Sequence, residues 1–237
     1  MEKEDRGKLI DAILFNLFFL LIIWVVWWVE EDFGWRLTKW GTRPRTLRGL
    51  IGIITTPFLH GSFEHIIGNS LSFVSLSTFL IFFYRSIAFK VITLLYILSG
   101  ILLWTIAFGG NHIGVSGVIY GLASFLFFSG IFRRNQQLLR VSLAVAFIYG
   151  SIVWWVLPID PNISWEGHLA GSIVGIILAI VYRGEGGPEP KKYQWEIDEE
   201  REAEEERIRL MEEVAEDIES EDVEDDPTRG WYESDWT

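Results

Sequence analysis

The sequence predicts an all-α membrane protein, a bundle of six transmembrane helices with an acidic cytoplasmic tail. Half of the 237 residues are hydrophobic, 15% are aromatic and the mean hydropathy is +0.26, which is too apolar for a soluble fold of this size. Apolar runs long enough to cross about 30 Å of hydrocarbon recur along the chain. Residues 1–183 carry 14 Lys and Arg against 10 Asp and Glu, whereas residues 184–237 carry 6 against 22. We therefore predict a membrane-embedded domain over 1–183 and an acidic tail over 184–237, partly helical or disordered.

The first apolar run covers residues 9–29, a length sufficient to span the bilayer. It ends in Trp27, Trp28 and two acidic residues, where a cleaved signal peptide needs small residues, so we predict an uncleaved helix. Five further helices are predicted from the apolar runs at residues 66–84, 87–108, 115–132, 141–157 and 165–182.

The short connections between these runs differ in charge. Those at 85–90 and 133–140 contain Lys and Arg, as do both ends of the bundle, whereas the loops at 109–114 and 158–164 contain neither. Lys and Arg favour the cytoplasmic side of a membrane. We therefore predict a multi-pass protein of the cell membrane with both termini in the cytoplasm.

The long connection over residues 30–63 is an exception, because it is predicted to lie outside and yet is basic. Its cations are Arg36, Lys39, Arg43, Arg45 and Arg48. The length of the segment, together with Trp35 and Trp40, predicts an interfacial element that contacts lipid headgroups.

In the tail, apolar residues recur at nearly helical spacing between residues 196 and 221. They are Ile197, Ile208, Met211, Ala215 and Ile218. The pattern fits a solvated helix or a docking surface for a partner of unknown identity, and it contains no catalytic candidate.

Polar residues gather at one depth of the predicted bundle. Asn69 lies near the start of the second helix, Ser116 at the start of the fourth and His168 at the start of the sixth, and these helices all run from outside to inside. Polar groups are costly at membrane depth, by about 2.5 to 3.5 kcal/mol for a charge, so each is a candidate for function. We expect an active site near the outer face.

A serine hydroxyl becomes a nucleophile when a neutral histidine takes its proton. Ser116 has Gly114 and Gly117 beside it, and His168 is followed by Gly171. Small residues allow two membrane helices to approach closely. We therefore predict that Ser116 and His168 meet as nucleophile and base.

Acyl transfer also needs donors for the oxyanion that forms. The fourth helix begins at Ser116, so its free backbone N–H groups point to where that charge develops. His65 and Asn69, four residues apart, can add side-chain donors. Tyr120, one turn after Ser116, can stack on His168. Nucleophile, base and oxyanion donors are thus all present, and we expect no cofactor.

These residues resemble those of the rhomboid family of intramembrane serine proteases. The matching strings are HGSFEHIIGN, GVSGVIYG and GHLAGSIVG, in the family's order and on its second, fourth and sixth helices. The resemblance implies a Ser116–His168 dyad without a carboxylate partner and an oxyanion hole formed by the Ser116 N–H, His65 and Asn69. It also implies a structural role for His60 in the first loop, and cleavage within or beside transmembrane helices of other proteins.

The resemblance extends from about residue 50 to residue 182, with one departure. Many members carry a Trp-Arg pair shortly before the first histidine, whereas here Trp35 and Arg36 lie far upstream of His60. The first loop is therefore of a variant type.

Other interpretations of these residues remain open. His112 lies four residues before Ser116 and is a rival base. In an alternative interpretation, Asn69 joins two helices by a hydrogen bond and has no catalytic role. In the same way, His65 and Tyr120 have an alternative role in packing alone.

A metal site is not expected. His60 and His65 are five residues apart, not the four that would put two ligands on one helical face, and the chain has no cysteine. The sequence contains no nucleotide-binding loop, and we expect no nucleic-acid partner.

The function predicted is that of a serine endopeptidase whose substrates are single-pass proteins anchored in the same lipid bilayer. The alternative is a rhomboid-like protein that binds transmembrane clients without cutting them. A small transporter is a third hypothesis, which the outer position of the polar residues disfavours.

Overall fold

The computed structural model describes residues 3–160, 163–187 and 194–224. Within these residues every regular element is a helix, and the one β-type contact is an isolated bridge between Thr42 and His112. The predicted all-α class is therefore confirmed.

The chain separates into two compact units, Met1–Pro188 and Glu189–Thr237. The division falls slightly beyond the predicted boundary at residue 183. The predicted disordered end of the tail lies outside the described residues.

Among the described residues, five stretches of the first unit are long and apolar enough to cross a membrane. They are α1 (Lys3–Phe33), α3 (Phe63–Phe83), α4 (Arg85–Ile106), α5 (Ser116–Arg133), and α6 (Gln136–Tyr149) together with the 3-10 helix η3 (Gly150–Val156). The apolar α7 (Trp165–Val181) has 17 residues. These helices show a multi-pass membrane protein, and the sixth crossing, by α7, remains a prediction.

Two helices differ most from their predicted bounds. The helix α1 begins six residues before the apolar run at 9–29, because charged residues form its first turns. The run at 141–157 is not one helix: α6 begins at Gln136, where the Asn135 side chain accepts from the Gln137 and Leu138 backbone N–H groups, and the chain tightens into η3 after Tyr149.

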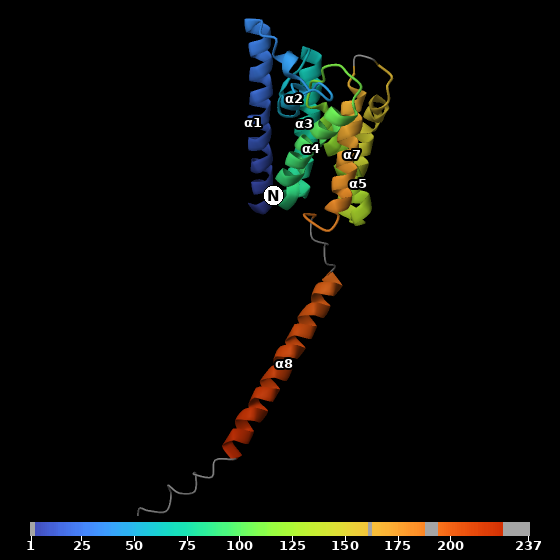
Figure 1. The fold of residues 1–237 in the computed structure, drawn as a ribbon. Helices are drawn as coiled ribbons and strands as arrows, with labels where there is room; N and C mark the ends of the chain where they lie inside the picture. The colour runs from blue at the N-terminus through green and yellow to red at the C-terminus, as the bar shows by residue number, and fades with distance from the viewer. Residues whose placement is uncertain (1–2, 161–162, 188–193, 225–237) are drawn as a thin grey trace, which may run out of the picture. The chain divides into compact units, whose positions relative to one another are not determined.

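The helix α5 lies at the centre of the membrane unit and packs against α3, α4, α6 and α7. Its Leu122, Phe125 and Leu126 are fully buried. Figure 1 shows α5 and α7 side by side, and α1 at the opposite edge of this bundle. The site described below is carried by this central pair.

Polar side chains join α1 to α3. The buried Asn16 donates to Thr78 Oγ1 at 3.0 Å and accepts from Ser77 Oγ at 2.6 Å, and the Trp24 indole donates to Ser70 Oγ at 3.1 Å. These bonds lie between membrane helices, where few other polar partners exist.

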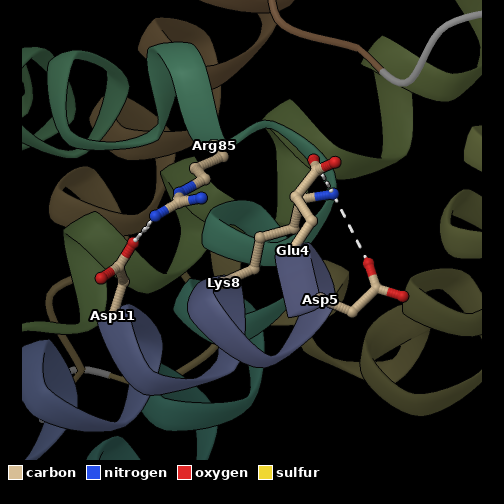
Figure 2. Close-up of polar contacts among 5 residues, drawn as sticks. All are labelled: Glu4, Asp5, Lys8, Asp11 and Arg85. Carbon is tan, nitrogen blue, oxygen red and sulfur yellow. Dashed lines mark hydrogen bonds and ion pairs between the residues drawn. The ribbon is translucent and has the colours of Figure 1, made fainter. Parts of the chain in front are cut away.

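Charged residues extend this attachment to the start of α4. Figure 2 shows Arg85 bound to Asp11, with Lys8 bound to both Glu4 and Asp5. Arg85 Nη2 lies 2.7 Å from Asp11 Oδ2.

The predicted interfacial segment folds into short helices, η1 (Leu37–Trp40), α2 (Gly49–Thr55) and η2 (Thr56–Phe58). The helix α2 packs against α4. The Arg45 N–H donates to Trp104 O at 3.1 Å, and Trp104 Nε1 donates to Thr46 O at 3.0 Å. The segment is therefore fixed to the bundle.

The second unit contains the helix α8 (Gln194–Glu224). Ile197, Ile208 and Met211 of the predicted apolar stripe are exposed, whereas the side chain of Ile218 lies outside the described part of the chain. A partner of α8 remains a hypothesis.

Candidate active site

Glycines bring α5 and α7 into backbone contact. A Cβ added to Gly171 would overlap the carbonyl oxygen of Gly117, and one added to Gly175 would overlap that of Gly121. Two helix backbones can meet in this way only where side chains are missing. The spacing of these glycines therefore sets the relative depth of the two helix starts.

The dyad predicted from the sequence is brought together at these starts. Ser116 is the first residue of α5 and His168 is the fourth of α7. Ser116 Oγ lies 3.1 Å from His168 Nε2, within hydrogen-bond reach. His168 is buried and Ser116 is half-buried, so the hydroxyl stays accessible.

Two backbone carbonyls of η3 accept hydrogen bonds from the side chains of His168 and Tyr120. His168 Nδ1 lies 2.9 Å from Trp155 O, and Tyr120 Oη donates to Ile152 O at 2.8 Å. A carbonyl only accepts, so Nδ1 carries the proton and Nε2 of the neutral ring is free to accept from Ser116. The Tyr120 and His168 rings stack with centroids 4.0 Å apart and planes within 6°. The predicted stacking is present, whereas the two carbonyl anchors were missed, because no residue type signals them.

The loop before Ser116 lies against the two predicted oxyanion donors. Gly114 has φ +103°, and a Cβ there would lie 2.8 Å from His65 Nε2 and 3.3 Å from Asn69 Nδ2. The Gly114 N–H donates to Thr56 O at 2.9 Å. Glycine is needed here both for this φ and for the close approach of the two side chains.

Asn69 keeps a free donor at this point. Its Nδ2 is buried and has no hydrogen-bond partner among the described residues. A buried donor without a partner is unusual and costly. A negatively charged oxygen beside Ser116 would supply the missing partner.

A cavity of about 1220 Å³ opens on these groups. It is lined by Ser116, His168, Tyr120, His65 and Asn69, and by the loops around Asn111 and Asp160. Polar side chains are among those that line it, so water can enter beside the dyad.

His112, the rival base, has other partners. Its Nδ1 lies 2.6 Å from Ser164 Oγ and its Nε2 lies 2.7 Å from Gly109 O. The Ser164 carbonyl in turn accepts from the Gly167 and His168 N–H groups. His112 thus braces the start of α7, while His168 contacts the serine. Sequence reasoning missed this link, because Ser164 is 52 residues away.

His60 is buried beside His65 and is not among the described residues that contact Ser116 Oγ. Its side chain is 2% exposed, and its ring centroid is 5.0 Å from that of His65. Burial, with a smaller contribution from the charge of His65, lowers the pKa of His60 to about 4, so the ring is neutral at pH 7. The Phe58 backbone slightly favours the protonated ring, yet neither ring nitrogen has a partner of hydrogen-bond geometry among the described residues. This environment fits a residue that packs the first loop.

The four histidines do not form a metal site in the structure. No group of three or more His, Asp or Glu side chains in the described part of the chain could hold a metal ion.

Comparison with known proteins identifies the family. The model of the rhomboid domain matches residues 47–185. Uncharacterized proteins of Mycobacterium bovis and Mycobacterium tuberculosis are each 31% identical over 172 residues, which cover 69% of this chain and 72% of theirs. A protein of Acanthamoeba polyphaga mimivirus, whose name assigns it provisionally to the rhomboid proteins, is 31% identical over 140 residues, 56% of this chain and 75% of its own. The matched region contains the cavity, the glycine contact and both members of the Ser116–His168 pair, and the chain belongs to the rhomboid family.

Proposed function

We propose that the protein is an intramembrane serine endopeptidase that cleaves transmembrane or juxtamembrane segments of membrane-anchored proteins. The observation that carries this proposal is the 3.1 Å contact between Ser116 Oγ and His168 Nε2 on the wall of a solvent-accessible cavity. Membership of the family does not by itself require proteolytic activity. The Ser116–His168 pair supplies the chemical reason to expect such activity.

In the first step, Ser116 Oγ attacks the carbonyl carbon of the scissile peptide bond while His168 Nε2 accepts the hydroxyl proton. Trp155 O, which accepts from Nδ1, holds the ring in orientation and stabilises the imidazolium that forms. The carbonyl therefore does part of what a carboxylate does in a triad.

The tetrahedral oxyanion then needs donors. The Ser116 N–H at the start of α5, Asn69 Nδ2 and His65 are the nearest candidates, and the α5 dipole favours negative charge there. Loss of one such donor costs about 10² to 10³ in rate in other serine proteases.

Collapse of this intermediate breaks the C–N bond, and His168 Nε2–H gives its proton to the leaving amine. Water from the cavity, deprotonated by His168 Nε2, then attacks the acyl carbonyl carbon. The ester bond to Ser116 Oγ breaks, His168 returns the proton to this oxygen, and the second fragment leaves. We infer that the cavity faces the outer side of the cell membrane and that both termini are cytoplasmic, in agreement with the Lys and Arg of the short connections and of the two ends of the bundle.

The test uses purified protein in liposomes with a single-pass substrate. Ser116→Ala and His168→Ala are each expected to reduce cleavage by at least about 10³-fold. Labelling by a fluorophosphonate should disappear in Ser116→Ala. The matched control is Ser124→Ala, two turns along α5, which should leave both measurements unchanged. Normal cleavage by either dyad variant would contradict the proposal.

The alternative, a client-binding protein without proteolysis, gives a different result in this experiment. It predicts no fluorophosphonate labelling of the natural sequence, together with substrate binding that is indifferent to Ser116→Ala.

A further inference from the structure

The segment between α1 and α3 presents positive charge that no acidic residue in the described part of the chain pairs. Arg36, Lys39, Arg45 and Arg48 are exposed, Arg43 is half-buried, and none makes an ion pair with a described residue. The acidic residues nearest in the chain give no compensation, since Glu30 accepts from Thr38 and neither Glu31 nor Asp32 forms an ion pair with these cations among the described residues.

Two of the cations converge on one aromatic ring. Lys39 Nζ lies 5.7 Å from the centroid of the Trp40 ring, and the Arg48 guanidinium carbon lies 5.0 Å from the same centroid. Each contact is a favourable cation–π interaction. Two like charges held near one ring repel each other, however, and an anion that binds to both would reduce that repulsion.

Hydrogen bonds hold the backbone that carries this ring before any ligand binds. Thr55 Oγ1 donates to the backbone Trp40 O at 2.6 Å, which ties the main chain at Trp40 to the end of α2. Thr38 donates to Glu30 Oε1 from its N–H at 2.8 Å and from its hydroxyl at 2.9 Å, which ties η1 to the end of α1. A preformed arrangement loses less conformational entropy on binding.

The surface around the two cations is apolar. On and just before α2, Leu47 is 86% exposed, and Leu50, Ile51 and Ile54 are exposed too. Asn111 Nδ2 donates to Thr38 O at 2.8 Å, so the segment lies at the same end of the membrane unit as the cavity. A ligand that matches both features has an anionic head and apolar chains.

We propose that Lys39, Arg48 and the Trp40 ring bind the phosphate of an anionic phospholipid, whose acyl chains lie on the exposed apolar side chains of α2. This inference is independent of the proposed proteolysis. It gives the unpaired cations a ligand in the headgroup layer, where each Lys or Arg near an anionic membrane surface strengthens binding.

The site can be tested on the full chain purified in an uncharged detergent. Native mass spectrometry at increasing concentrations of dioctanoylphosphatidylglycerol or dioctanoylphosphatidylcholine yields a Kd for each lipid. We expect the first phosphatidylglycerol to bind about tenfold more tightly than the first phosphatidylcholine. The double variant Lys39→Gln with Arg48→Gln should lose most of that preference.

Two further variants separate the site from general charge effects. Lys39→Arg with Arg48→Lys keeps both charges and should keep the preference. Arg207→Gln with Arg209→Gln removes two cations from α8 and should also keep it. These expectations hold whether or not the protein cleaves substrates, because the measurement does not use activity.

Several results would overturn the inference. Equal affinity of the natural protein for the two lipids would do so, as would an undiminished preference in the Gln variant or an equal loss in the α8 control. Inorganic phosphate that displaced phosphatidylglycerol at matched concentration would show that the site recognises free phosphate and not a lipid.

Discussion

Helices α5 and α7 meet through their backbones, whereas α1 and α3 are joined by side-chain hydrogen bonds. In the first interface no atom separates Gly171 from the Gly117 carbonyl, while in the second Asn16 reaches across to Ser77 and Thr78. Backbone contact fixes the distance between the two helices, because no side chain lies between them that could change its conformation. Side-chain bonds can lengthen, change rotamer or exchange partners. The pair Ser116–His168 lies on the rigid interface, which is where a reaction that depends on tenths of an ångström is best carried.

The largest effect on the free energy of unfolding is expected from Gly171→Ala. The added Cβ would overlap Gly117 O, so the helices must separate. Overpacking of this kind typically costs about 1 to 3 kcal/mol, and we expect the upper end in unfolding by sodium dodecyl sulfate. The rate of cleavage should also fall, by about 10²-fold, because the Ser116–His168 distance depends on this contact.

Gly68→Ala is the matched control, because an added Cβ there meets no atom within 4 Å. Alanine in the interior of a helix should raise the free energy of unfolding by about 0.5 to 1 kcal/mol relative to glycine. If Gly171→Ala behaved like Gly68→Ala, the α5–α7 interface would not be the rigid contact described above.

An intermediate effect is expected from Asn16→Leu, which breaks the side-chain interface. Its partner Ser77 keeps a second acceptor, the Phe73 carbonyl, at 2.6 Å. Hydrogen bonds between membrane helices contribute about 0.6 kcal/mol on average and at most about 1.7. We therefore expect a loss of about 1 kcal/mol in unfolding by sodium dodecyl sulfate.

Fluorophosphonate labelling of Ser116 should stay near the natural rate in Asn16→Leu, because the dyad lies on the other interface. A loss of labelling comparable to that of Gly171→Ala would mean that both interfaces position the site equally, against the distinction between them.

The two interfaces also differ in how far the sequence predicted them. The glycines around Ser116 and His168 predicted a close helix contact, because small residues in a membrane helix have few other uses. The shared depth of the two residues followed from topology. The role of Asn16 was not predicted, because it lies in an otherwise apolar run and its partners are more than 60 residues away.

The carbonyl anchors of the site could not be predicted for a physical reason. Every residue has a carbonyl, so Trp155 O and Ile152 O become distinctive only where the chain leaves α-helical geometry and exposes them. In the apolar run at 141–157, Gly150 and Ser151 stand where the chain changes to η3 after Tyr149, but a Gly-Ser pair does not specify which carbonyls become exposed. The family resemblance likewise rests on residue types, so it does not predict the contacts made by the Trp155 and Ile152 carbonyls.

The smallest effect is expected at the charged end of the α1 attachment, where Arg85 binds Asp11 (Figure 2). The two side chains are 46% and 36% exposed, and exposed ion pairs contribute about 0.2 to 1 kcal/mol. A double-mutant cycle of Asp11→Asn and Arg85→Gln, measured by unfolding, should give a coupling energy of about 0.5 kcal/mol.

The Glu4–Lys8 pair, measured through Glu4→Gln and Lys8→Gln, is the control with contacts inside one helix. A coupling above about 2 kcal/mol for Asp11–Arg85 would indicate a pair removed from water. The attachment of α1 would then depend on one contact as strictly as α7 depends on its glycines.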